Sequence, residues 1–343
     1  MRIAIVNTMF PYVRGGAEIL VDDLAEQLQV RGHNVTVFRF PFPYDFGKPL
    51  LHTIEASKLF VFDDYDKVIT FKFPAYCIEH KSMVIWMFHQ FRQVYDLWDS
   101  QYGLSGTPQN EVLKDIVIHA DRSISKAKHI FTIAHEVTNR LAKYSHIHSK
   151  VLPHSPKNIE SYKSCSTGDT IFCPSRITEL KRQLLAVEAM KYTKTQVKLL
   201  IAGICEDDEY NNRIHRTIYE NKLENRVQYE NRWISDEEKR DWLSTSLSII
   251  YLPYKEDSCG LVSMEAFYSQ KPVITCVDSG GILELVEDHK TGYVCQPTPQ
   301  SLAHAMDELY MDKHCAKQMG IAAYEEIIRR DITWDATIEK LLG

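Results

Sequence analysis

Several classes of protein are excluded by what this 343-residue sequence lacks. No apolar run approaches the ~18–20 residues that a membrane-spanning helix needs, and the opening segment MRIAIVNTMF is too short and too polar for a signal peptide. The eight cysteines form no C-x-x-C pair and mostly lie inside apolar runs, which is typical of buried thiols in a reducing compartment. We therefore expect a cytoplasmic protein, with a peripheral contact with a membrane surface as an open alternative.

The sequence also has no excess of basic residues. Its 40 Lys and Arg residues are outnumbered by 46 Asp and Glu residues, which gives a formal net charge of −6. Without a positive field there is no counterion release to drive binding to a polyanion, so we expect no nucleic-acid partner. The acidic pairs Asp63-Asp64 and Asp207-Asp208 have no convergent ligands around them, and we predict no metal site. The sequence predicts no particular oligomeric state.

The chain length and the order of patterns predict two α/β domains. A chain of this length is more than one core usually serves. Residues 150–169 lose hydrophobic periodicity and gain proline, serine and lysine, which is typical of a linker. We predict a first domain at 1–150, a second at 151–325 and a final helical segment at 326–343. Apolar runs alternate with helical patterns, which predicts parallel sheets in both halves. The predicted strands are 2–7, 35–38, 67–71, 84–88 and 129–134, then 170–174, 197–202, 227–230, 247–252 and 273–277.

The most informative stretch runs from Tyr251 to Gly292. An apolar, β-branched strand is followed by a polar loop that ends at Gly260. A helical pattern begins at Leu261. The free N–H groups and the positive dipole end of that helix favour an anion. Asp257 lies in the loop and Glu265 one turn into the helix, so the two acids could face one bound molecule. The alternative is an ordinary strand, loop and helix with solvated acids.

Two cations follow the first strand of the second half. Arg176 lies on a loop and Lys181 at a helix start, five residues apart. The planar guanidinium of Arg176 and the compact ammonium of Lys181 could therefore bind one diphosphate. The alternative is that both are solvated.

Three features of the first half carry weaker signals. Gly15-Gly16 opens a helix after a loop of about eight residues, which is too long for a tight dinucleotide-binding turn. His89 stands at the end of a predicted strand, where open α/β sheets bind ligands, although a histidine beside aromatics is often a packing residue. The aromatic and proline-rich residues 39–60 either hold an acceptor or only cover the sheet.

These motifs together resemble the glycosyltransferase family 4 group of GT-B enzymes. Residues 251–292 resemble its nucleotide-sugar motif, in which an acid, seven residues and a glutamate precede a K-P-V segment; the first acid here is Asp257 and the residue before the glycine, usually aromatic, is Cys259. The string HQFRQVYDLW at 89–98 resembles the H-Q-x-R-x-x-Y-D-L-W segment of a bacterial subgroup. The pairs Gly15-Gly16 and Arg176–Lys181 resemble the G-G-A-E and R-x-x-x-x-K elements of the family.

The resemblance implies a fold and an activity. The implied fold is GT-B, with two doubly wound Rossmann-like domains whose parallel sheets face a central cleft, and a final W-D-bearing helix that crosses back to the first domain. The implied activity is retaining transfer of a hexose from a nucleotide diphosphate sugar, with UDP favoured, to a hydroxyl of a glycan or lipid-linked glycan, without cofactor or metal. The alternatives are a non-hydrolysing nucleotide-sugar epimerase and a catalytically silent nucleotide-sugar-binding subunit.

The resemblance also implies roles for individual residues. Glu265 would accept hydrogen bonds from the ribose hydroxyls and Asp257 from the transferred sugar. Cys259, beside the helix N-terminus, is either a reactive thiol of lowered pKa or a buried spacer. The catalytic residues so implied are His89, Arg176, Lys181, Asp257 and Glu265. The implied donor-binding residues are Gly15, Gly16, Arg176, Lys181, Trp233, Asp257, Cys259, Gly260, Leu261, Val262 and Glu265.

Overall fold

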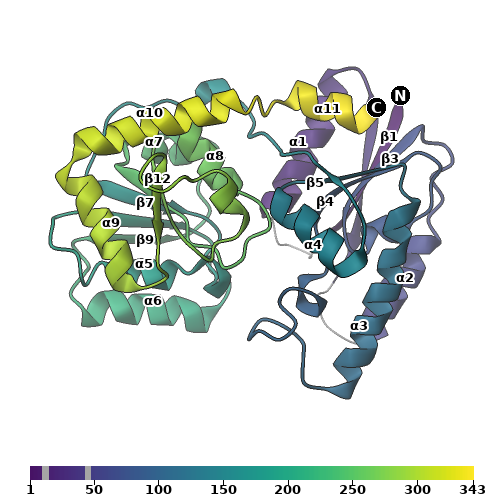
Figure 1. The fold of residues 1–343 in the computed structure, drawn as a ribbon, viewed down its shortest axis with the longest axis horizontal. Coiled ribbons are helices and arrows are strands. Elements are labelled where there is room, and N and C mark those ends of the chain that lie inside the picture. The colour runs from purple at the N-terminus through teal and green to yellow at the C-terminus, as the bar shows by residue number, and fades with distance from the viewer. Residues whose placement is uncertain (10–14, 43–47) are drawn as a thin grey trace. The chain divides into compact units, whose positions relative to one another are not determined.

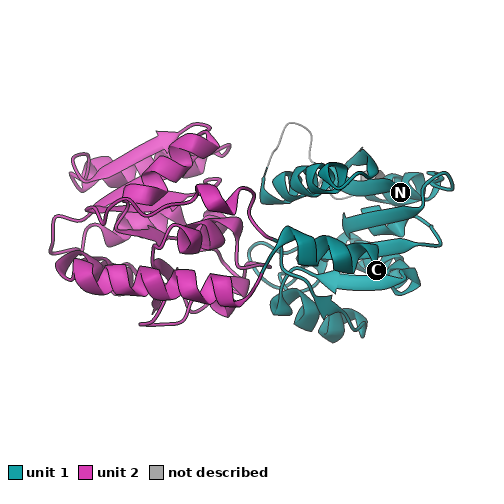
Figure 2. Cartoon of the chain, turned by 90° about the horizontal axis from the view of Figure 1, so that it is seen from above, with its two compact units in different colours: residues 1–154, 332–343 teal, residues 155–331 magenta. Residues whose placement is uncertain are grey.

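The computed structural model describes residues 1–9, 15–42 and 48–343. Part of the aromatic segment 39–60 and most of the loop before Gly15 lie outside the described residues. The chain divides into two compact units, of which unit 1 comprises residues 1–154 and 332–343 and unit 2 comprises residues 155–331 (Figure 2). Among the described residues, no helix has the length and apolar character needed to cross a membrane.

Unit 1 is built on a parallel six-stranded sheet with the order β2-β1-β3-β4-β5-β6 (Figure 1). Residues such as Ile3, Ile5 and Val84 are fully buried, because a parallel sheet is covered on both faces. The strands are β1 (Arg2–Met9), β2 (Asn34–Pro41), β3 (Lys67–Lys72), β4 (Met83–His89), β5 (His129–Thr132) and β6 (Lys150–Val151). The helices are α1 (Gly16–Val30), α2 (Lys48–Lys58), α3 (Pro108–Asp121), α4 (His135–Ser145) and α11 (Trp334–Leu342).

The last helix, α11, belongs to unit 1 although its sequence follows unit 2. The indole of Trp334 meets that of Trp86 edge to face, with 6.4 Å between ring centroids. Lys67 donates from Nζ to the carbonyl of Leu341 at 3.1 Å, which satisfies one of the carbonyls that a helix leaves open at its end. The end of the chain is therefore anchored on the sheet of unit 1.

Unit 2 repeats the doubly wound plan with the strand order β12-β11-β10-β7-β8-β9. Its strands are β7 (Thr170–Pro174), β8 (Lys198–Gly203), β9 (Val227–Asn231), β10 (Ser248–Ile250), β11 (Val273–Cys276) and β12 (Gly292–Cys295). Its helices are α5 (Gln183–Ala189), α6 (Asp208–Glu220), α7 (Asp236–Thr245), α8 (Leu261–Tyr268), α9 (Pro299–Met311) and α10 (Lys313–Arg329). All its strand pairs are parallel, as the sequence predicts, and α5 packs against α6 and α9.

Candidate active site

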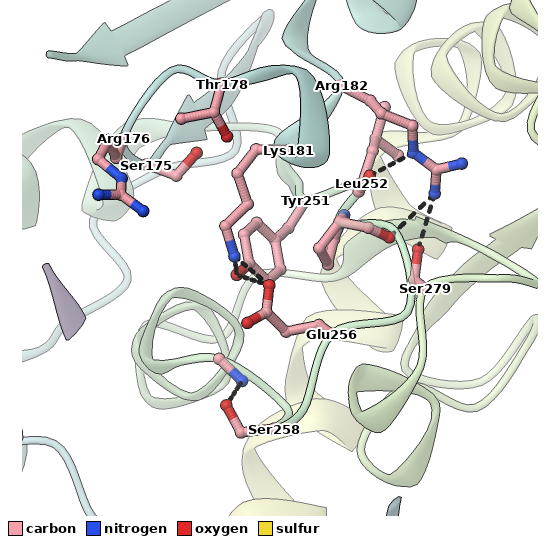
Figure 3. A network of polar contacts seen from close by, with 12 residues as sticks. Ser175, Arg176, Thr178, Lys181, Arg182, Tyr251, Leu252, Glu256, Ser258 and Ser279 are labelled. Atoms are coloured by element: carbon pink, nitrogen blue, oxygen red, sulfur yellow. Dashed lines mark hydrogen bonds and ion pairs between the residues drawn. The ribbon is translucent and has the colours of Figure 1, made fainter. Parts of the chain in front are cut away.

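The acids and cations predicted in unit 2 lie at one edge of its sheet. The carboxyl ends of β7, β10 and β11 meet there, because the strands are parallel and adjacent. Backbone hydrogen bonds join the loops that follow these strands: Tyr254 donates to the carbonyl of Leu180 at 2.8 Å and Glu256 to that of Ser279 at 3.0 Å. The three loops therefore form one connected surface (Figure 3).

Arg182 holds this surface together and was missed by sequence reasoning. Its guanidinium donates to the carbonyls of Leu252 and Pro253, at 2.7 and 2.9 Å, and makes a two-pronged pair with Asp278 at 2.7 and 2.9 Å. The side chain is only 16% exposed. One arginine thus ties the loop after β7 to the loops after β10 and β11. Its partners lie seventy or more residues away in sequence, so no local pattern points to them.

Lys181 points its ammonium into the same surface. Its Nζ lies 2.6 Å from the hydroxyl oxygen of Tyr251 and forms an ion pair with Glu256. Burial alone would lower the pKa of Lys181, but the Glu256 carboxylate and the hydrogen bonds outweigh it and raise that pKa. Lys181 is therefore a fixed, permanently charged cation beside the carboxylate of Glu256.

Arg176 differs from both neighbouring cations. Its side chain is exposed and forms no hydrogen bond or ion pair with any residue that the structure describes. Its backbone is fixed, because its carbonyl accepts from Gln183 Nε2 at 3.1 Å. In Figure 3 the Arg176 guanidinium stands apart from every dashed contact, while dashed lines join that of Arg182 to neighbouring loop residues such as Leu252 and Ser279. The bonding capacity of Arg176 is thus available to a ligand.

The N-terminus of α8 lies beside Lys181 because Tyr251 contacts both. Gly260 has a positive φ of 74°, and a Cβ there would lie 2.7 Å from the Tyr251 ring, so only glycine fits. The Gly260 N–H donates to Ser258 Oγ at 3.2 Å and so is not a free donor as predicted. Those of Leu261 and Val262, also predicted, have no acceptor among the described residues.

The two predicted acids differ in their surroundings. Glu265 is 5% exposed and accepts hydrogen bonds from Lys239 Nζ at 2.7 Å and from the Tyr162 hydroxyl at 3.0 Å. Sequence reasoning did not anticipate either donor. Asp257 is 7% exposed, in the loop that carries Glu256. Both acids are buried, which argues against the alternative in which they are solvated.

The prediction of a reactive Cys259 thiol is wrong in this structure. Burial raises the pKa of Cys259 to about 12, and the negative charge of Glu284 acts in the same direction. These effects outweigh the stabilisation of a thiolate by the helix N-terminus. Moving a thiolate out of water costs more free energy than the positive end of one helix dipole provides. The alternative, a spacer, agrees with this pKa.

Trp233 is 56% exposed in the loop between β9 and α7, at the same edge of the sheet as Arg176. Its indole is therefore accessible for stacking. Among the described residues, no group of three or more His, Cys, Asp or Glu side chains is placed to hold a metal ion.

The predicted glycine element of unit 1 begins α1. The Gly15 N–H donates to Glu18 Oε2 at 3.0 Å, and Glu18 Oε1 lies 3.1 Å from Lys72 Nζ. Burial would raise the pKa of Glu18, but the charge of Lys72 together with the hydrogen bonds from Lys72 and from the Gly15 N–H outweighs burial and lowers that pKa. A Cβ added at Gly16 would meet no described atom within 4 Å.

His89 is the last residue of β4, as predicted, and its Nδ1 lies 2.7 Å from the carbonyl oxygen of Gln90. The residues that follow it are mostly engaged inside unit 1. Gln90 Nε2 donates to buried Asp121 at 3.0 Å, and Arg92 forms a two-pronged pair with Asp96 at 2.7 and 3.1 Å. His89 is thus at a strand end on a segment that internal bonds hold in place.

Comparisons with known proteins agree with this geometry. The Dictyostelium discoideum protein named alpha-1,3/1,6-mannosyltransferase ALG2 is 34% identical over 140 residues, which are 39% of this chain and 32% of that protein. The chain spans about a third of the length of the curated relatives it matches.

Two solved structures share the fold. Sucrose-phosphate synthase from Thermosynechococcus elongatus superposes with a TM-score of 0.79 at 17% identity, covering 98% of this chain and 97% of that one. Anabaena HepE in complex with UDP and glucose gives 0.70 at 17% identity, covering 99% of both chains. With two parallel six-stranded sheets, these likenesses show the GT-B fold expected from the sequence.

The sequence pattern of one enzyme family covers nearly all of unit 2. The pattern described as glycosyl transferases group 1 matches residues 155–326, a little over half of the chain. The matched residues include Arg176, Lys181 and Glu265, around which the edge of unit 2 is built. The chain therefore belongs to the glycosyl transferases group 1 family and has the GT-B fold.

Proposed function

We propose that the chain is a retaining glycosyltransferase that moves a hexose from a nucleoside diphosphate sugar to a hydroxyl of a glycan or lipid-linked glycan. The observation that carries the proposal is the carboxyl edge of unit 2. There the free Arg176 guanidinium, the Lys181 ammonium and the open N–H groups at the start of α8 are held by one hydrogen-bonded set of loops. This combination of charges and donors suits a diphosphate.

Transfer needs the bond between the anomeric carbon and the diphosphate to break as the acceptor oxygen forms its own bond to that carbon. Negative charge then develops on the leaving diphosphate, and Arg176, Lys181 and the α8 N-terminus stabilise it. Lys181 and the backbone of the α8 N-terminus are fixed before the donor arrives, so only the Arg176 side chain has to be ordered. With two cations and a helix end to neutralise the leaving group, we propose that no metal ion takes part.

The environment of Glu265 supports retention. A double displacement needs a carboxylate free to attack the anomeric carbon, and an inverting reaction needs a general base on the opposite face. Glu265 is buried and already bonded to Lys239 and Tyr162, which suits hydroxyl binding better than attack. We propose that the acceptor attacks from the face the diphosphate leaves, and that the departing phosphate oxygen takes the acceptor proton.

The relatives support a hexose donor. ALG2 is named a mannosyltransferase, and HepE was solved with UDP and glucose. We favour UDP as the nucleotide, with Trp233 stacking on the base, Asp257 binding the sugar hydroxyls and His89 binding the sugar. The segment at 89–98 favours the bacterial subgroup with H-Q-x-R-x-x-Y-D-L-W.

The test is incubation with a panel of UDP-, GDP- and ADP-hexoses and glycan or lipid-linked glycan acceptors, in the presence and absence of a chelator. We expect transfer, or slow donor hydrolysis, to be unaffected by the chelator. NMR coupling constants should show an α-linked product from an α-linked donor. Interconversion of two nucleotide sugars would instead indicate an epimerase, binding without turnover a silent subunit, and a β-linked product an inverting enzyme.

A further inference from the structure

The Glu265 carboxylate is bonded on one oxygen only. It lies in α8, whose residues from Ser263 to Tyr268 are all buried. Lys239 Nζ and the Tyr162 hydroxyl both donate to the same atom, Oε1, at 2.7 and 3.0 Å. Oε2 has no hydrogen-bond partner among the residues that the structure describes. Because each carboxylate oxygen can accept about two hydrogen bonds, half of the accepting capacity of Glu265 is unused.

The two donors come from separate elements and are themselves fixed. Lys239 lies in α7 with its side chain 19% exposed, and its Nζ is also 3.5 Å from Asp236, whose carboxylate is largely exposed. Tyr162 follows a short turn near the start of unit 2, and its ring stacks on that of Tyr268 with centroids 6.5 Å apart. Three segments far apart in the sequence therefore converge on one oxygen atom.

If the Glu265 carboxylate served packing alone, two donors on a single oxygen would be an unfavourable way to satisfy its hydrogen-bonding capacity. A buried carboxylate is costly unless its charge is paired and its lone pairs are used. Donors shared between both oxygens would satisfy it better than two donors on Oε1. Two donors on Oε1 fix the plane of the Glu265 carboxylate, and the Lys239 ammonium compensates its negative charge. Oε2 stays able to accept hydrogen bonds.

We propose that Lys239 and Tyr162 are positioning residues that hold Glu265 by Oε1 so that Oε2 accepts hydrogen bonds from the vicinal diol of a ribonucleotide. The inference rests on the proposed function, since the ligand is a nucleoside diphosphate. It adds that the orientation of the Glu265 carboxylate depends on these two donors. It also assigns them the selection of ribonucleotides over deoxyribonucleotides.

The experiment is calorimetric titration of the full chain with whichever of UDP, GDP and ADP binds most tightly, and with its 2′-deoxy counterpart. The wild type should prefer the ribonucleotide by about ten- to a hundred-fold, the range for a hydrogen bond to a charged group. Lys239→Met should reduce this preference to about three- to tenfold. Without the ammonium, the Glu265 carboxylate loses one of the two donors that fix its plane, so Oε2 is directed less well at the diol.

Tyr162→Phe removes only one hydroxyl and should reduce the preference less, by about two- to fivefold. The Tyr162→Phe variant also tests the inference if Lys239→Met folds poorly. Lys313→Met is the matched control, because Lys313 forms an exposed ion pair with Asp169, which precedes β7 at the opposite edge of the same sheet. This control should leave the preference unchanged.

The outcomes separate this inference from the function on which it rests. A wild type that binds no nucleoside diphosphate would overturn the proposed function. A wild type that binds ribo- and deoxyribonucleotides equally would overturn this inference alone. If Lys239→Met and Tyr162→Phe weaken both nucleotides by the same factor, the two donors act only on stability and the inference is wrong.

Discussion

Both sheets place polar residues beyond the carboxyl ends of their strands, but the two units use them differently. In unit 1, Glu18 pairs with Lys72. The segment after His89 forms a hydrogen bond to Asp121 and an ion pair between two of its own residues. In unit 2, the Arg176 guanidinium and one oxygen of Glu265 have no partner among the described residues. Unused bonding capacity thus marks the strand ends of unit 2 as the candidate ligand site.

The largest effect is expected at Arg182, which holds the loops of unit 2 in place. Arg182→Ala removes its bonds to two carbonyls and leaves the largely buried Asp278 without its cation. We expect the free energy of unfolding to fall by about 3–5 kcal/mol, measured by urea denaturation. Arg213→Ala removes an exposed pair with Glu179 and should cost about 1 kcal/mol or less. Equal losses in the two variants would contradict the role given to Arg182.

Arg176 should show the opposite behaviour, because it has no partner in the described chain. Arg176→Ala should weaken nucleoside diphosphate binding by about ten- to a hundred-fold, in calorimetry, and change the free energy of unfolding by less than ~0.5 kcal/mol. Arg216→Ala, an exposed arginine of α6, should change neither quantity. Unchanged affinity in Arg176→Ala would remove this residue from the site.

In unit 1, the buried Asp121 should show itself in the pH dependence of stability. Burial raises its pKa to about 6 despite hydrogen bonds from Tyr76, Tyr95 and Gln90. The folded state therefore holds this proton at a higher pH than the unfolded state, so the stabilisation is complete below pH ~4 and is lost as pH rises through ~6. The loss is on the order of 3 kcal/mol, since one pKa unit corresponds to about 1.4 kcal/mol.

Asp121→Asn provides the comparison, since the amide cannot titrate. Urea denaturation between pH 4 and 7 should show wild-type stability falling relative to the variant as the pH rises. Parallel pH profiles for the two proteins would show that Asp121 titrates as it does in the unfolded chain.

The smallest effect is expected at Glu256, whose carboxylate occupies the Lys181 ammonium. Glu256→Gln removes a charge that competes with the diphosphate for Lys181, so affinity for a nucleoside diphosphate should rise by up to about fivefold. Weaker binding in calorimetry would mean that Glu256 orients Lys181 for the ligand instead of competing with it.

The alternation of strand and helix patterns was enough to predict both parallel sheets and to place Arg176, Lys181 and Glu265 at strand ends or helix starts. What escaped prediction depends on long-range contacts. Nothing near Glu265 in sequence points to Lys239 or Tyr162, and nothing near Arg182 points to Asp278.

Two local inferences at the start of α8 failed for a related reason. The N–H of Gly260 is used by Ser258, and burial sets the pKa of Cys259. A helix start is visible in the sequence, but the packing and side-chain hydroxyls around it are not. The four-residue strand β12 also escaped, because so short an apolar segment carries no clear period.

The central claim is that unit 2 holds the diphosphate of the donor through Arg176, Lys181 and the first turn of α8. Hydrogen–deuterium exchange of the full chain tests it most directly, with and without a saturating concentration of the tightest-binding nucleoside diphosphate. We predict slower exchange in peptides that cover residues 175–183 and 257–265, because the open N–H groups of Leu261 and Val262 gain acceptors. Slower exchange at 15–18 and 89–98, with no change in the peptides of unit 2, would contradict the claim.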